Sequence, residues 1–268
     1  GLHTTFVLTQ TEFKNQKIYV RAHNIEHLFY KGLYKSEVNF FKKSFYKQEA
    51  KKLKSYEAIL EKVDGIFSIS PFEQDYFKNK YGKKSNYIPA FHFVPDSLKL
   101  SLKGKIVFYH GNLSVSENIS AAEFLIDIYD KTDYHLVIAS SFENQKILNS
   151  ISKSENTSFK KINSDEDLEI LFEKAHINVL PTFQKTGIKL KLLNSLYQSR
   201  FLIANNFMVE DTGLESLVEI ANNKKDFLTK TKLLFNREFT SNIQKDRFKK
   251  LQELNPEKSA QKIIDIIF

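Results

Sequence analysis

Residues 181–196 read Pro-Thr-Phe-Gln-Lys-Thr-Gly-Ile-Lys-Leu-Lys-Leu-Leu-Asn-Ser-Leu, the most informative part of the chain for fold class. This stretch follows His176–Leu180, an apolar run typical of a buried strand, and its proline ends that strand. A polar loop leads to Gly187, after which leucines recur at helical spacing. A strand, a loop and a helix in this order aim backbone N–H groups at the space above the strand end, where Lys189 and Lys191 add positive charge. The stretch therefore predicts an α/β unit with a phosphate or diphosphate site.

The same residues allow a second interpretation. The helix would begin with a basic turn exposed to solvent and would pack a leucine face in the core, without binding a ligand. Leu190, Leu193 and Tyr197 share that face. Lysines near a helix N-terminus oppose the helix macrodipole, and such local conflicts are expected at functional sites. The residues alone leave both interpretations open.

The rest of the chain alternates strand-like and helix-like segments in two series, within residues 1–98 and 101–256. A segment without clear periodicity, residues 90–104, indicates a linker between them. Alternating strands and helices form parallel sheets covered on both faces, with ligands outside the carboxyl ends of the strands. We therefore expect two doubly wound domains. The expected strands are Thr5–Thr9, Lys17–Arg21, Gly65–Ser70, Asn86–Pro89, Ile106–Tyr109, Tyr134–Ala139, Ser158–Ile162, Ile177–Leu180, Phe201–Ala204 and Leu217–Ala221.

A long helix is expected from Val38 to Val63. Its apolar residues fall at core-like spacing and favour a buried helix. That stripe consists of Phe41, Phe45, Leu53, Tyr56 and Leu60. The alternative is a helix lying on an anionic membrane, because many lysines stand among the phenylalanines.

The formal net charge of +8 favours anionic partners, namely nucleotide diphosphates, acidic lipid surfaces or nucleic acid. A basic protein without such a partner is the plain alternative. No motif of a nucleic-acid-binding fold accompanies the 12 tyrosines and 24 phenylalanines, so we expect no nucleic-acid partner. The chain begins Gly-Leu-His without an initiating methionine, and we expect it to start inside a longer protein.

Several kinds of site are excluded by composition. The chain has no cysteine, so it forms no disulfide and no thiolate metal site. No apolar run in this sequence approaches the roughly 20 residues of a membrane-spanning helix. His23 and His27 lie four residues apart, but no third ligand follows in a zinc-binding pattern, so we expect no metal site.

Two further places carry side chains suited to chemistry. Gly111 and Asn112 follow an expected strand, and the glycine permits a tight turn with close backbone approach to a ligand. His23 follows the strand expected at Lys17–Arg21, and His3 lies near the start of the chain. A neutral imidazole there could bond a sugar hydroxyl or stabilise developing charge, although a structural histidine is the more common case.

Several segments in chain order together resemble the GT-B glycosyltransferases of the large retaining family 4. The first-series segments are Arg-Ala-His-Asn-Ile-Glu at 21–26, Phe-Ser-Ile-Ser-Pro-Phe-Glu at 67–73 and Tyr-Ile-Pro at 87–89. The second-series segments are Phe-Tyr-His-Gly-Asn at 108–112, Glu-Asn at 117–118, Ala-His-Ile-Asn-Val-Leu-Pro at 175–181 and residues 186–196. Each motif is modest alone, whereas their order and spacing are specific.

The resemblance implies two Rossmann-like doubly wound domains in the GT-B arrangement, the N-terminal one incomplete. Residues 1–98 would form the acceptor-side domain, with the helix 257–268 packing back on it, and residues 101–256 would bind the donor. The implied reaction is hexosyl transfer, with retention, from a UDP-, GDP- or ADP-sugar to an acceptor hydroxyl. No metal or cofactor is implied.

The resemblance also implies which residues act. Gly111, Asn112, Gly187 and Lys191 would contact the donor diphosphate, with Lys189 beside them. His3 is the best match to the histidine near the transferred sugar, and His23 is second. The acceptor would be a saccharide or lipid-linked saccharide of a bacterial surface polysaccharide or glycolipid. The implied location is the cytoplasm, with peripheral contact to the inner face of an anionic plasma membrane as an option.

Two positions depart from the family pattern. Thr186 and Asn194 stand where members of the family carry two glutamates eight positions apart. The resemblance implies that both still bind the donor, Thr186 at the sugar and Asn194 at the ribose hydroxyls without charge assistance. The alternative function is therefore a catalytically silent glycosyltransferase-like binding module.

Overall fold

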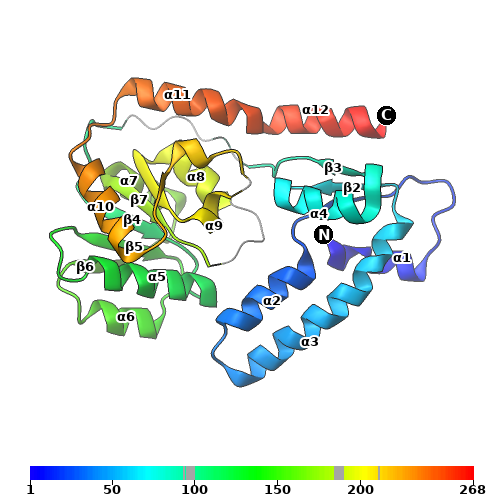
Figure 1. Ribbon diagram of the computed structural model, residues 1–268, viewed down its shortest axis with the longest axis horizontal. Coiled ribbons are helices and arrows are strands. Elements are labelled where there is room, and N and C mark those ends of the chain that lie inside the picture. The colour runs from blue at the N-terminus through cyan, green and yellow to red at the C-terminus, as the bar shows by residue number, and fades with distance from the viewer. Residues whose placement is uncertain (93, 95–99, 184–189, 211) are drawn as a thin grey trace. The chain divides into compact units, whose positions relative to one another are not determined.

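The computed structural model describes residues 1–92, 94, 100–183, 190–210 and 212–268, which form two compact α/β units (Figure 1). Gly1–His92 and Glu253–Phe268 make up the first unit, and the described residues from 94 to 252 make up the second. Each unit is built on a parallel sheet, which confirms the prediction of two Rossmann-like domains.

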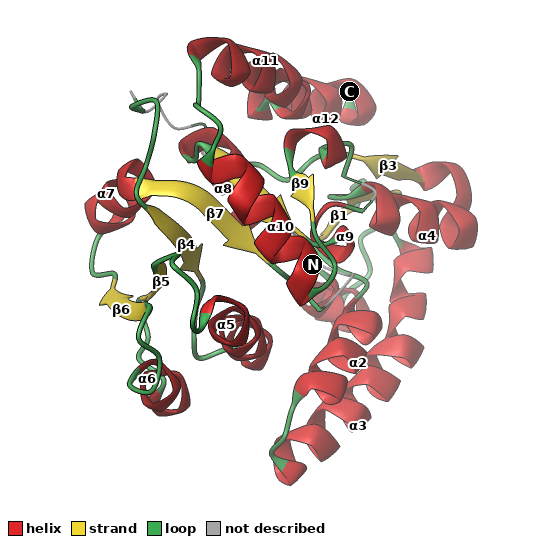
Figure 2. Ribbon diagram, turned by 60° about the vertical axis from the view of Figure 1, so that its left-hand side comes forward, coloured by secondary structure: helices red, strands yellow, loops and turns green. Residues whose placement is uncertain are grey.

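The second unit has a six-stranded sheet in the order β6-β5-β4-β7-β8-β9. The strands are β4 (Ile106–His110), β5 (Leu136–Ser140), β6 (Thr157–Lys161), β7 (Ala175–Leu180), β8 (Phe201–Ala204) and β9 (Glu219–Ile220). The helices of one face are α5 (Ser116–Tyr129), α6 (Gln145–Ile151) and α10 (Lys224–Phe235), and those of the other are α7 (Asp165–Lys174) and α8 (Leu190–Gln198) (Figure 2). The central strands β5, β4, β7 and β8 are buried along nearly their whole length, which explains their apolar runs, whereas the edge strands β6 and β9 are partly exposed.

The first unit has a three-stranded sheet in the order β1-β2-β3, formed by Tyr19–Ala22, Gly65–Ser68 and Ser85–Tyr87. Helix α4 (Pro71–Tyr81) follows β2, and the Ser70 hydroxyl accepts a hydrogen bond from the Glu73 backbone N–H at 3.2 Å.

The remaining helices of four or more residues in the described part of both units are α1 (Val7–Gln10), α2 (Glu26–Ser36), α3 (Phe40–Tyr56), α9 (Asn206–Val209), α11 (Ser241–Leu251), α12 (Pro256–Ile267) and the 3-10 helices Leu2–Phe6 and Glu57–Lys62. None of the described helices combines the length and apolar character that crossing a membrane requires.

The strand predicted at Thr5–Thr9 is wrong, because this segment is helical. The hydroxyls of Thr5 and Thr9 donate to the carbonyls of Leu2 and Phe6, three residues back, at 2.7 Å each. The hydroxyls therefore bond backbone carbonyl oxygens within the helical turns. Leu2, Thr5 and Leu8, spaced three residues apart, lie on one side of these turns and are buried. The β propensity of threonine is overridden by this packing.

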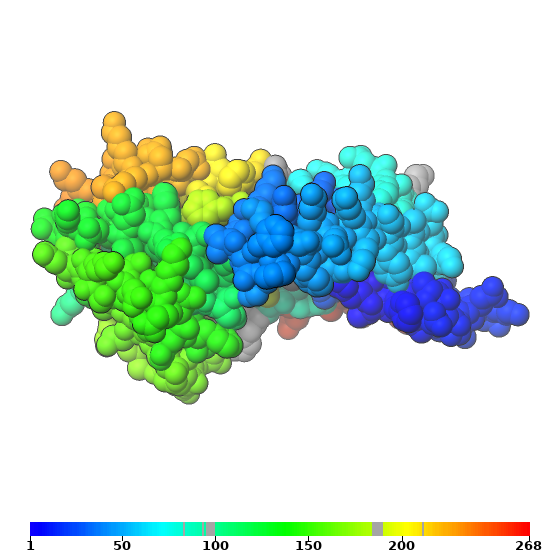
Figure 3. Space-filling model, turned by 90° about the horizontal axis from the view of Figure 1, so that it is seen from below, coloured from blue at the N-terminus to red at the C-terminus, as the bar shows by residue number. Residues whose placement is uncertain are grey.

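The long helix predicted from Val38 to Val63 is two elements, α3 and the 3-10 helix Glu57–Lys62, and α3 pairs with α2 as a hairpin. Leu53 and Leu60 are buried as expected, whereas Phe41 and Phe45 are exposed, so the predicted core stripe is wrong in the first half of the helix. Figure 3 looks onto the end of this hairpin. The distal part of α3 has α2 as its main neighbour, so its outer face stays in solvent.

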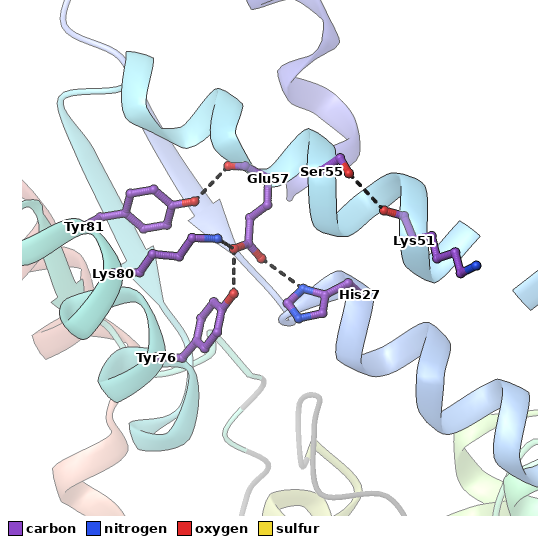
Figure 4. Close-up of polar contacts among 7 residues, drawn as sticks. All are labelled: His27, Lys51, Ser55, Glu57, Tyr76, Lys80 and Tyr81. Atoms are coloured by element: carbon purple, nitrogen blue, oxygen red, sulfur yellow. Dashed lines mark hydrogen bonds and ion pairs between the residues drawn. The ribbon is translucent and has the colours of Figure 1, made fainter. Parts of the chain in front are cut away.

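A buried carboxylate ties the base of this hairpin to α4 (Figure 4). Glu57 accepts hydrogen bonds from the Tyr76 hydroxyl at 2.7 Å and from the Lys80 ammonium, and His27 Nδ1 lies 3.3 Å from its other oxygen. Burial and the bond to Glu57 raise the pKa of Tyr76 to about 12. His27 is buried in this cluster.

Candidate donor-binding site

The direction of strand order reverses between β4 and β7, which are neighbours in the second unit. In doubly wound sheets, ligands bind at such a switch point, outside the carboxyl ends of the strands. Gly111 and Asn112 directly follow β4, Thr182 lies two residues beyond β7, and Lys191 lies in the first turn of α8. The chain thus brings residues from three distant segments to the edge where a ligand is expected.

The Lys191 ammonium is held in place by α5 and β4. Its Nζ donates to Asn118 Oδ1 at 2.9 Å and lies 5.1 Å from the centre of the Tyr109 ring. Asn118 Nδ2 donates in turn to the Asn112 carbonyl at 2.9 Å. A cation fixed beside the loop after β4 can offset negative charge there without costly reorganisation.

Gly111 is required by this close packing. A Cβ at this position would lie 2.9 Å from the Tyr109 hydroxyl oxygen, 3.0 Å from Lys191 Nζ and 3.2 Å from Asn118 Cγ. Tyr109 is fully buried, so a side chain at position 111 would crowd both its hydroxyl group and the Lys191 ammonium. The glycine therefore sets where the ammonium lies.

Gly111→Ala is expected to lower the affinity for a nucleoside diphosphate about tenfold, because it displaces Lys191 from its place beside the loop. Isothermal calorimetry on four proteins checks this: the parent chain, Gly111→Ala, Lys191→Ala and the double variant. If the glycine acts through the lysine, the double variant binds no more weakly than Lys191→Ala alone. Fully additive losses would contradict this account.

The loops after β7 and β8 are fixed by polar contacts to α5 and to each other. The Thr182 hydroxyl donates to Glu117 Oε1 in the first turn of α5. The buried Asn205 side chain accepts from the Thr182 backbone N–H at 3.0 Å and donates to the Thr182 carbonyl at 2.6 Å. These contacts position the beginning of the segment that leads into the candidate phosphate loop.

His110 at the end of β4 is buried against Phe108 and Phe172, with ring centroids at 5.5 and 5.4 Å. Burial, with the positive charge of Lys191 adding to it, lowers the pKa of His110 to about 3. The imidazole is therefore neutral at physiological pH. A neutral His110 does not attract a bound anion, so it does not compete with the Lys191 ammonium.

The buried His110 makes folding stability depend on pH. Its folded-state pKa lies below the unfolded value of 6.5, so the unfolded chain binds the extra proton and stability falls as pH drops from 6.5 towards 3. We expect the parent chain to lose about 1.4 kcal/mol more per pH unit in this window than His110→Phe. Urea unfolding of both proteins between pH 7 and pH 5 checks this. Parallel stability curves would contradict it.

Four predicted donor-binding residues need separate mention. Thr186, Gly187 and Lys189 lie outside the described residues. Asn194 is partly buried on α8, and its Oδ1 accepts a hydrogen bond from Gln198 Nε2 at 3.1 Å. Asn194 is thus engaged along its own helix. Leu190, predicted on the packed face of α8, is instead exposed at the first residue of the helix.

A hollow of about 640 Å³ lies at the carboxyl ends of β8 and β9 in the same unit. Its lining includes Phe183, Phe207, Asn206 and Asn222, together with Glu210 and Glu215. Aromatic faces and amide groups together suit a sugar, which presents C–H faces and hydroxyl edges. The hollow adds a second ligand-sized surface to this edge of the sheet.

One of the two predicted histidines of the first unit lies against a buried carboxylate. His3 Nε2 lies 3.6 Å from Glu26 Oε2, and burial raises the pKa of Glu26 against the opposing charge of His3. His23 and Glu26 both border Gly1, where a Cβ would lie 3.8 Å from His23 Nδ1 and 3.7 Å from Glu26 Oε1. Partial burial of its ring, with Arg21 nearby, lowers the pKa of His23.

Sequence reasoning missed Asn118, His110 and Asn205 as parts of the donor-side arrangement. Asn118 lies in a motif that the sequence singled out, but its contact with Lys191 spans 73 positions and has no local signal. No group of three or more His, Asp or Glu side chains in the described ranges is arranged to hold a metal ion.

No family model matches this chain. A curated protein from Klebsiella pneumoniae, described as an uncharacterized 44.6 kDa protein in the cps region, is 28% identical over 207 residues, or 72% of this chain and 53% of that protein. This chain therefore spans about half the length of that relative.

Solved structures are similar over nearly the whole chain. TarM matches with a TM-score of 0.73 at 15% identity, covering 100% of this chain and 53% of TarM. Sucrose-phosphate synthase from Thermosynechococcus elongatus matches with a TM-score of 0.70 at 14% identity, covering 99% of this chain and 70% of that enzyme. WaaB, a lipopolysaccharide outer core galactosyltransferase, matches with a TM-score of 0.53 at 10% identity, covering 87% and 69%. These similarities show that the chain has the fold of the GT-B glycosyltransferases.

Proposed function

We propose that this chain is part of a retaining glycosyltransferase that moves a hexosyl group from a nucleotide-diphosphate sugar to an acceptor hydroxyl. The observation that carries the proposal is the convergence of Gly111, Asn112 and Lys191 at the switch point between β4 and β7. A TarM variant from S. aureus has been solved with Fondaparinux, alpha-GlcNAc-glycerol and UDP, which supports a nucleotide donor and a saccharide acceptor here.

In this proposal the donor diphosphate lies against the loop after β4 and the Lys191 ammonium. The bond between the anomeric carbon and the diphosphate oxygen breaks, and the acceptor oxygen forms a new bond to that carbon on the same face. The acceptor proton leaves with the departing diphosphate. Lys191 stabilises the charge that builds on the leaving group, which is the main catalytic demand.

His3 and His23 serve the transferred sugar in this proposal, with Glu26 as a positioning residue. The carboxylate beside His3 favours one tautomer and one ring orientation. The hollow near Phe207 would take further sugar units. We also propose that no metal or organic cofactor is needed, so excess EDTA leaves the transfer rate unchanged.

The biological setting of this proposal is bacterial surface polysaccharide or glycolipid synthesis at the cytoplasmic face of the plasma membrane. It is supported by the Klebsiella relative, which is described as lying in the cps region, and by WaaB, a lipopolysaccharide galactosyltransferase. The acceptor would be a saccharide or a lipid-linked saccharide.

A catalytically silent binding module is the second candidate. Asn194 supports it, because an amide replaces the carboxylate expected there and its oxygen accepts a bond from Gln198. A neutral amide bonds a ribose hydroxyl without charge assistance. This candidate keeps donor binding and loses transfer.

Calorimetry with UDP-, GDP- and ADP-sugars separates these possibilities. We expect one base to bind, with the affinity lost in Lys191→Ala. Sugar transfer or donor hydrolysis that disappears in His3→Ala supports the enzyme, whereas binding without either supports the silent module. If none of the donors binds, the proposed donor site is wrong.

A further inference from the structure

The end of the α2–α3 hairpin exposes large apolar side chains at its turn. Val38, Phe40 and Phe41 are 92%, 78% and 82% exposed, and Phe45 one turn further along α3 is 54% exposed. Neighbouring tyrosines behave differently: Tyr30 and Tyr46 pack edge to face across the hairpin, with ring centroids 6.1 Å apart. The hairpin therefore has an aromatic interior of its own, and the exposed rings belong to a separate outer surface.

The turn that presents this surface is rigidly built. The buried Glu37 carboxylate accepts hydrogen bonds from the backbone N–H groups of Val38 and Asn39 at 2.9 Å each. The Asn39 side chain then caps α3, accepting from the N–H groups of Phe41 and Lys42 at 3.1 Å each. These caps fix the exposed residues at the tip, so presenting them costs little further ordering.

The charge around the tip is strongly positive. Residues 31–48 contain five lysines, Lys31, Lys35, Lys42, Lys43 and Lys47, and a single carboxylate, Glu37. That carboxylate is buried and bonded to backbone N–H groups, so it does little to offset the lysines at the surface. Figure 1 shows α2 and α3 running out from the sheet of the first unit to this turn, and Figure 3 views the same end of the hairpin from below.

We propose that the tip of the α2–α3 hairpin docks on an anionic lipid bilayer, with Val38, Phe40 and Phe41 entering the headgroup region and the lysines binding lipid phosphates. An exposed apolar tip needs no complementary pocket in a bilayer, whereas a protein partner would have to supply one. A second copy of the chain would place lysines against lysines, which is unfavourable. Nucleic acid would leave the apolar side chains without a partner. The inference stands independently of the proposed transferase activity.

Co-sedimentation with vesicles tests this inference without donor or acceptor. The chain should bind vesicles of phosphatidylcholine and phosphatidylglycerol in equal parts, and bind phosphatidylcholine vesicles at least about tenfold more weakly. Raising the salt should weaken binding without abolishing it, because the apolar contribution persists. Equal binding to both vesicles, or none to the anionic ones, would overturn the proposal.

Matched variants locate the docking surface. Phe40→Ser with Phe41→Ser should reduce anionic-vesicle binding about tenfold or more, whereas Phe142→Ser, which alters a ring 51% exposed in the second unit, should not. Lys42→Glu with Lys47→Glu should act like the first pair, and Lys153→Glu with Lys160→Glu should have a clearly smaller effect. Circular dichroism confirms folding, since all these side chains are on the surface. Loss of self-association in the tip variants, with unchanged vesicle binding, would instead identify a homodimer contact and overturn the proposal.

Discussion

Replacing Lys191 by alanine is expected to lower kcat/KM for sugar transfer by about 100-fold to 1000-fold. The ammonium lies beside the loop after β4, held by Asn118 Oδ1 at 2.9 Å, where charge would build on the leaving diphosphate. Removing one fixed donor to a developing oxyanion typically costs this much. Steady-state rates with the donor identified by calorimetry provide the measurement.

The matched control for Lys191→Ala is Lys146→Ala, which removes an exposed lysine from α6 of the same unit. Its kcat/KM should stay within about twofold of the parent value. A loss in Lys146→Ala similar to that in Lys191→Ala would point to the general basic charge of the chain. Asn118→Ala should fall between the two, because it removes a positioning contact and leaves the charge in place.

Arg200→Met is expected to destabilise the second unit by about 3–5 kcal/mol, the largest effect on stability that we expect from one substitution. Arg200 lies in the turn from α8 to β8 and its side chain is buried; its guanidinium donates to the carbonyls of Ser101, Glu173 and Ala175 at 2.8, 2.8 and 2.6 Å. A methionine would fill much of the volume and leave these carbonyls without their donor. Urea unfolding, with a comparison of midpoints at unchanged slope, measures the loss.

Arg237→Met provides the control, because Arg237 is exposed. It should change the free energy of unfolding by no more than about 0.5 kcal/mol. Arg200→Lys should recover only part of the loss, since an ammonium lacks the planar fork that reaches several carbonyls at once. If Arg200→Lys were as stable as the parent chain, charge rather than fork geometry would explain the role of this residue.

The central strands of the second unit, β5, β4, β7 and β8, were predictable because they are buried on both faces. Ile106–His110 and Phe201–Ala204 are apolar runs bounded by polar turns, and such runs identify strands without tertiary information. Thr5–Thr9 was predicted wrongly because β-branched residues also form helices when their hydroxyls bond back along the chain. Phe41 and Phe45 were assigned to the core because helical spacing identifies an apolar face without showing whether another element covers it.

The candidate site was predictable only in part. Gly111, Asn112 and Lys191 lie in motifs with recognisable local order, so the sequence could suggest a role for each of them. Two contacts depend on which strands are neighbours in the sheet, and the sequence does not show this order. They are the hydrogen bond between Lys191 and Asn118 and the one between Thr182 and Asn205. The sequence also could not show that Asn194 bonds Gln198, because an asparagine side chain has many local partners within reach.

The pairing of β4 with β7 has a consequence for how binding and folding are coupled. These strands are neighbours in the sheet, yet the register joins Phe108 to Asn178, across a long intervening stretch of chain. The candidate donor site thus forms only when a non-local pairing is complete, and a chain that had folded β4 and β5 alone would lack it. A nucleotide that binds only when β4 and β7 are paired would stabilise the folded second unit by mass action. Its presence should therefore raise the midpoint of thermal unfolding of this unit. Thermal stability thereby becomes a reporter of donor identity, even for a chain that transfers no sugar.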